Sequence, residues 1–101
     1  MRRLLFAVEG MTLRKDGDFS GITAGSKGYL CCHFGASESD WLKAKKVALF
    51  DENYPVVVSE AFECMIPSEV TSKKSFRVRL IGQNGPVRLQ TNPVLIEQVK
   101  G

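Results

Sequence analysis

Residues 75–82, SFRVRLIG, decide the fold class of this chain, because apolar and charged side chains alternate strictly along them. Phe76, Val78 and Leu80 fall on one side of an extended segment, and the arginines between them fall on the other. A period of two is typical of a strand in a half-buried sheet, with one face on a core and the other in water. This stretch therefore predicts a strand with a basic outward face.

The same rhythm of strands and turns extends along the whole chain. Short runs rich in Val, Ile, Phe, Tyr and Thr are separated by Gly, Asn, Asp and Pro. About seven or more strands fit this pattern, which predicts one all-β domain over residues 1–101. The expected strands, joined in one place by a long glycine-rich connection over 16–28, cover 3–9, 11–14, 28–34, 44–50, 56–60, 61–66, 75–81, 87–91 and 94–99.

DWLKAKKVALFD, residues 40–51, is the stretch where helix and strand compete. A helix would place Trp41, Ala44 and Ala48 on one face, but the remaining apolar residues scatter around the helical wheel. DENYP, with three turn-forming residues, and then VVVSE follow, and this order is typical of strand, turn and strand. We interpret 37–41 as a loop or short turn that leads into a strand from about residue 44 to 50.

Two shorter signals locate turns. Pro67 ends the run AFECMI because it lacks a backbone N–H, and PSEVTS, residues 67–72, resembles a corner or a single helical turn. The dipeptide Asn84-Gly85 tolerates positive φ and predicts a tight turn between two paired strands.

Composition excludes several classes of protein. The chain is 44% hydrophobic and 25% charged, values of an ordinary globular domain. Its net charge of +3 is spread along the sequence and indicates solubility more than a nucleic-acid partner. LLFAV near the N-terminus is shorter than a signal-peptide core and ends at Glu9, and no run spans a bilayer. We expect no membrane partner and no secretion by a signal peptide.

No catalytic or metal-binding pattern is visible. The three cysteines, Cys31, Cys32 and Cys64, are too few and odd in number for a disulfide framework, and neighbouring strand residues face opposite ways. At most one of the first two therefore faces Cys64, and free thiols are expected. His33 is the only histidine and cannot share a proton with Cys32 in regular strand geometry. We expect neither enzymatic activity nor a cofactor nor a metal.

A ligand-binding surface is the alternative to a structural role. A basic face beside the aromatic rings of Trp41 and Phe76 would suit single-stranded nucleic acid, and Tyr29 and Tyr54 would suit a sugar. We favour the other interpretation, in which the cations decorate exposed strands and the aromatic side chains pack in the core. The candidate cations are Lys43, Lys45, Lys46, Lys73, Lys74, Arg77 and Arg79.

The order of signals from residue 28 onward resembles small β-sandwich proteins of phages and prophages of Gram-positive bacteria. It is similar to the immunoglobulin-like N-terminal domain of baseplate upper proteins and of related tail appendage proteins. The most specific element is Cys-x-Ile-Pro-x-Glu-Val. The segments that carry the resemblance are DW at 40–41, VALF at 47–50, CMIPSEV at 64–70, FRVRLIG at 76–82, TN at 91–92 and VKG at 99–101.

This resemblance implies an immunoglobulin-like antiparallel β-sandwich in a virion tail or baseplate. The expected function is non-enzymatic assembly with other tail or baseplate proteins, or with a second copy, in the virion or in the bacterial cytoplasm before assembly. From the strand pattern we name Tyr54, in the DENYP turn, and Arg77 and Arg79, on the outward face of their strand, as candidate contact residues. The alternative function is a β module that binds carbohydrate or single-stranded nucleic acid.

Overall fold

The computed structural model describes residues 1–101 and contains nine strands and two short helices. The expected all-β class is confirmed, and no helix is long and apolar enough to cross a membrane. In chain order the elements are β1 Arg2–Glu9, β2 Thr12–Lys15, β3 Leu30–Ala36, α1 Ser39–Lys43, β4 Lys45–Phe50, β5 Tyr54–Val57, β6 Glu63–Met65, α2 Ser68–Thr71, β7 Ser75–Asn84, β8 Val87–Gln90 and β9 Val94–Glu97.

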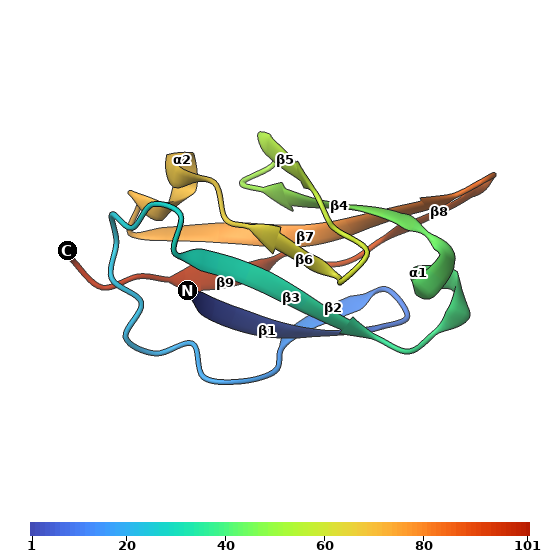
Figure 1. The fold of residues 1–101 in the computed structure, drawn as a ribbon, viewed down its shortest axis with the longest axis horizontal. Coiled ribbons are helices and arrows are strands. Elements are labelled where there is room, and N and C mark those ends of the chain that lie inside the picture. The colour runs from blue at the N-terminus through green and yellow to red at the C-terminus, as the bar shows by residue number, and fades with distance from the viewer.

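Two sheets form the layers of a sandwich (Figure 1). The four-stranded sheet has the order β2-β1-β3-β6. The five-stranded sheet has the order β5-β4-β7-β8, and β9 also pairs with β7. The chain changes sheet through α1 between β3 and β4, again between β5 and β6, and through α2 between β6 and β7, so the two sheets fold as one unit.

Antiparallel pairing holds for every pair of strands except β1 and β3, which run parallel. Parallel neighbours need a connection of about a dozen residues or more. The segment 16–28, expected to be a long connection, returns the chain to the start of β1 after the β1–β2 hairpin (Figure 1). The long loop therefore makes this departure from a wholly antiparallel sandwich possible.

The core lies between the sheets and takes side chains from both of them. Alternating residues of β1, β3, β4 and β7 point inward, which is why each of these strands has a buried face and a more exposed one. The largest fully buried side chains are Trp41, Phe6, Phe34, Phe50 and Phe76.

Most of the expected local elements are confirmed, but the strand expected over 56–60 is shifted to Tyr54–Val57, and the region around residue 40 also differs. The strand β4 is present, but the preceding residues form α1 rather than a loop or short turn. Asp40 in its first turn and Lys43 in its last turn suit the helix dipole. Trp41 anchors α1, because its buried indole N–H donates a hydrogen bond to the Gly10 carbonyl, N to O 2.7 Å.

Candidate protein-interaction surface

The outer face of the five-stranded sheet carries a group of apolar side chains that are exposed or half-buried. Val57 on β5 is opposite Val47 on β4, which is opposite Ile81 on β7, and Pro55 is opposite Leu49 in the next row. Val57 is 77% exposed, and Val47, Leu49 and Ile81 are half-buried. We call these five residues the apolar patch.

Charged side chains border the apolar patch, and their signs differ between its two ends. Lys45 and Arg88 lie in one row of the sheet, opposite Gln83 on either side. At the other end Glu97 lies opposite Ser75, and Glu52 lies in the turn between β4 and β5. The face therefore has a cationic end and an end of mixed charge, where Glu52 and Glu97 lie close to Lys73, Arg77 and Arg79.

The turn between β4 and β5 forms a small ionic cluster beside the patch. The Asp51 carboxylate accepts hydrogen bonds from the Lys73 ammonium at 2.7 Å and from the Arg77 backbone N–H at 2.8 Å. Burial alone would raise the pKa of Asp51, but these hydrogen bonds outweigh it and lower that pKa. Glu52 pairs with Arg79 at 2.7 Å. Asp51 and Glu52 both have positive φ, and these pairs hold them there.

The three predicted contact residues divide between the two sides of the sheet. Arg77 and Arg79 lie on the outward face, where they line a cavity of about 540 Å³ over the ionic cluster. Arg79 is fixed by Glu52 and by Gln90, whereas the Arg77 guanidinium makes no ion pair. Tyr54 is the first residue of β5 and packs half-buried against the core. Only the arginines therefore share an accessible surface.

The expected basic and aromatic residues do not form a nucleic-acid platform. Trp41 and Phe76 are each 1% exposed, so their rings cannot stack on bases. Lys46 was expected on an exposed face, and this is wrong, because its side chain points inward, on the same side of β4 as Ala48. Its ammonium donates to the carbonyls of Trp41 and Ala44, each at 2.8 Å, and burial lowers its pKa. The period of two along β4 was the signal that sequence reasoning missed.

The sheet edges are less open to added strands than the face is to docking. On β5 the Val58 N–H bonds to the Lys46 carbonyl, and this register turns the backbone groups of Pro55 and Val57 outward. Pro55 has no N–H to offer, so it weakens this edge as a template. The Asn92 side chain covers the β2 edge, since it bonds the Leu13 N–H at 2.8 Å and the Leu13 carbonyl at 3.0 Å.

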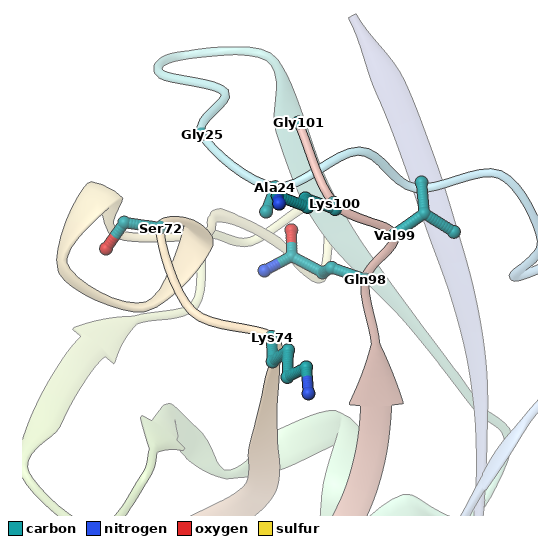
Figure 2. A pocket seen from close by; sticks show the side chains of 8 residues that line it. All are labelled: Ala24, Gly25, Ser72, Lys74, Gln98, Val99, Lys100 and Gly101. Carbon is teal, nitrogen blue, oxygen red and sulfur yellow. The ribbon is translucent and has the colours of Figure 1, made fainter.

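A second cavity, of about 820 Å³, lies between the residues after α2 and the C-terminal segment (Figure 2). Gln98 is buried there, and its Nε2 donates to the carbonyls of Thr71 and Lys73 at 3.1 and 2.7 Å. The Oε1 of the same side chain has no hydrogen-bond partner. Lys74 and Lys100 add two cations to the lining, so the cavity suits an anion that also carries a donor. Sequence reasoning did not single out this site.

The cysteines and the histidine occupy the four-stranded sheet. All three cysteines are buried and free, as expected, and only Cys32 lies opposite Cys64. His33 faces outward, where its Nδ1 lies 3.2 Å from a Glu63 carboxylate oxygen that Arg3 also contacts. No group of three or more metal-ligating side chains is present.

No family model, no curated protein and no solved structure matches this chain. The functional interpretation consequently depends on the geometry above and on the resemblance described from the sequence. The apolar patch contains Val57, which at 77% has the highest exposed fraction among the large hydrophobic residues of the chain.

Proposed function

We propose that this chain is a non-enzymatic structural module that binds protein partners through the outer face of its five-stranded sheet. The proposed setting, the tail or baseplate of a phage or prophage of Gram-positive bacteria, comes from the sequence resemblance. An immunoglobulin-like classification of the sandwich belongs to the same proposal, and the repeated crossing of the chain between the sheets β2-β1-β3-β6 and β5-β4-β7-β8 supports it, while the parallel pairing of β1 with β3 is a departure from that fold. The single observation that carries the proposed activity is the unpartnered apolar patch.

Burial of the apolar patch is the driving force in this proposal. Covering an apolar side chain such as Val or Leu completely stabilises an association by about 1.5–3 kcal/mol. The molecule measures 42 × 25 Å along its two longer axes, which is large enough for the roughly 800 Å² that each partner contributes to a typical interface. Since Pro55 and Asn92 disfavour strand addition at two edges, we propose that docking occurs by packing of sheet faces.

A second copy of this chain is the partner that the face fits best. A two-fold axis through the patch would place the end with Lys45 and Arg88 over the partner's end with Glu52 and Glu97. The two apolar patches would then cover each other, and Glu97, which makes no ion pair within its own chain, would offer a carboxylate to the cationic end of the partner. Other tail or baseplate proteins would join the assembly around this pair.

Light scattering over a concentration series tests the proposal. We expect the wild-type mass to rise above that of a monomer and Val57→Asp to remain monomeric, because a carboxylate at the centre of the interface would lose its hydration. Met11→Asp is the matched control, because Met11 is 69% exposed, Val57 is 77% exposed, and Met11 lies in the hairpin of the other sheet. A wild-type protein that is monomeric at every concentration would refute self-association through this face.

A charge-reversal variant tests the arginines of the same face. Replacing Arg77 and Arg79 together by Glu breaks the ion pair of Arg79 with Glu52 and makes this end of an outward surface acidic, so the fold should survive while assembly is altered. Circular dichroism checks the fold, and light scattering checks the mass. Unchanged assembly in a folded variant would remove this end of the face from the interface.

A ligand-binding module remains the second candidate, on the specific observation of the unpaired Gln98 Oε1 between Lys74 and Lys100. An acceptor beside two cations suits a hydroxylated anion such as a sugar phosphate. Amide NMR shifts during titration with glucose 6-phosphate, confined to residues 23–26, 72–74 and 98–101, would support it. Binding of an oligonucleotide that weakens steeply with salt would instead support the nucleic-acid version.

A further inference from the structure

Cys32 and Cys64 are direct cross-strand neighbours whose side chains both enter the core. They are paired in the register of β3 and β6, and the Phe34 N–H bonds to the Phe62 carbonyl two residues along. This pattern makes Cys32 and Cys64 a hydrogen-bonded antiparallel pair, in which Cα atoms lie about 5.5 Å apart. Disulfides span Cα separations of about 4.4–6.8 Å, so the backbone already has the spacing of a crosslink.

We propose that Cys32 and Cys64 are a modification site, a dithiol that a disulfide-type oxidant converts reversibly to an intramolecular disulfide between β3 and β6. The inference is independent of the proposed docking function, because both thiols lie in the core between the two sheets and not on the outer face of the five-stranded sheet. An odd number of cysteines in the sequence does not by itself indicate that two of them form a disulfide.

Access to the pair is through the edge strand. Cys32 is fully buried and Cys64 is 7% exposed. Burial, together with the neighbouring Cys64 thiol, raises the pKa of Cys32, so the closed fold contains little thiolate at that position. However, β6 has only three residues and lies at the end of its sheet, and short edge segments open locally without global unfolding. Oxidation therefore begins at Cys64 and is limited by the opening of β6.

The reaction balances with oxidised glutathione as the oxidant. The Cys64 thiolate attacks one sulfur of glutathione disulfide, forms a mixed disulfide and releases one glutathione thiolate. Cys32 then loses its proton, attacks the Cys64 sulfur and releases the second glutathione. Two electrons pass from the protein thiols to the oxidant, and two molecules of glutathione leave.

Cys31 is excluded from this reaction by its orientation. It is paired with Met65 and lies beside Arg3, so it points to the opposite side of the sheet from Cys32 and Cys64. Burial raises the pKa of its thiol as well. Neighbouring residues of a strand cannot close a disulfide in this geometry, and Cys31 should remain reduced.

The crosslink would change the stability of the whole sandwich. The closed ring runs from residue 32 to 64 and contains β4 and β5 of the five-stranded sheet together with most of β3 and the start of β6 of the four-stranded sheet. A disulfide that closes a ring of this length restricts the unfolded chain, and we expect the melting temperature to rise by about 10 °C. Reduction by dithiothreitol should return it to the starting value.

The test is native oxidation of the folded protein with oxidised glutathione, followed by intact mass and peptide mapping without reductant. We expect a loss of two hydrogen atoms, a linked pair of peptides that contain Cys32 and Cys64, and a raised melting temperature. Cys31→Ser should behave like the wild type. Cys64→Ala should gain one glutathione at most and should show no rise in melting temperature.

Three results would overturn the proposal. They are a wild-type protein whose thiols remain unchanged after prolonged native oxidation, a product that carries glutathione only on Cys31, and a disulfide that includes Cys31. Because Cys64→Ala could unfold, a second comparison uses the wild type alone. Oxidation in urea should give mixed pairings, and oxidation of the native state should give only Cys32 with Cys64.

Discussion

Gly82 on β7 lies directly beneath the ring of Trp41, and this contact gives a sharp test of how the sandwich is packed. A Cβ atom at Gly82 would lie 2.8 Å from Cζ3 of Trp41 and 3.1 Å from the Ala44 Cβ. Both distances are shorter than ordinary carbon contacts. Gly82 does not have positive φ, so the only obstacle to alanine is the lack of space.

The expected cost of Gly82→Ala follows from what the indole would have to do. The ring is 1% exposed and its N–H is bonded to the Gly10 carbonyl, so moving it would strand a buried donor. Forcing an extra methyl group into a packed core costs about 1–3 kcal/mol. The loss of unfolded-state freedom on replacing glycine returns about 0.4–1 kcal/mol. We therefore expect a net destabilisation of about 1–2 kcal/mol, and a melting temperature lower by about 5–10 °C.

Urea unfolding monitored by fluorescence measures this change, since Trp41 is the only tryptophan. Gly35→Ala is the matched control, because Gly35 also lies in a strand and a Cβ there would meet only the Phe6 carbonyl oxygen at 3.5 Å. We expect the control to stay within about 0.5 kcal/mol of the wild type. If Gly82→Ala changed the free energy of unfolding as little as the control does, this would contradict the close packing of α1 against β7.

Two further substitutions test the edge and the ionic cluster. Asn92→Ala removes both bonds to the Leu13 backbone, so we expect a loss of about 1–3 kcal/mol in urea unfolding and more aggregation, while Asn92→Asp, which keeps only the acceptor, should be intermediate. The pKa of Asp51 is lower in the folded state than its ordinary value of 3.8, so its stabilising effect is present above that value and is lost as the pH falls below it. Asp51→Asn tolerates the same positive φ and should show a shallower loss of stability from about pH 4 to pH 2 in thermal melts; an unchanged slope would contradict this assignment.

Strands were predictable from the sequence because their signal is local. The alternation around Phe76 required a half-buried sheet whatever the rest of the chain did. The tight turn predicted at Asn84-Gly85 is present one residue later, at Gly85-Pro86, because Asn84 pairs with Val87 as the last residue of β7 and only Gly85 has positive φ. The period of two also predicted that at most one of the two adjacent cysteines faces Cys64, and the structure shows that it is Cys32. Helix α1 was harder, since five residues hold too few turns for a periodic signal, and it depends on a bond from Trp41 to a distant carbonyl.

Contacts between distant residues account for what the sequence did not reveal. The parallel pairing of β1 with β3 depends on where a long loop returns, and composition does not determine that. Tyr54 was predicted to lie in a turn, but it pairs with Phe50 as the first residue of β5, and its ring points toward the core. The burial of Lys46 and the capping role of Asn92 need partners that lie across the fold.

The contrast between the two outer faces is the strongest argument for where a partner docks. On the four-stranded sheet the exposed charges already satisfy one another, since Arg3 pairs with Glu63 and Arg14 pairs with Glu9. The five-stranded sheet has paired charges only around its turn, and beyond them Val57 is left in water. Burying the first face would cover Leu5 and Met65, which are 41% and 37% exposed, but would also remove water from these ion pairs at a cost. The row of Val57, Val47 and Ile81 on the second face contains no ion pair, so covering it would remove water from apolar atoms at a gain. Association through the five-stranded sheet is therefore the favoured direction for any partner of matching shape.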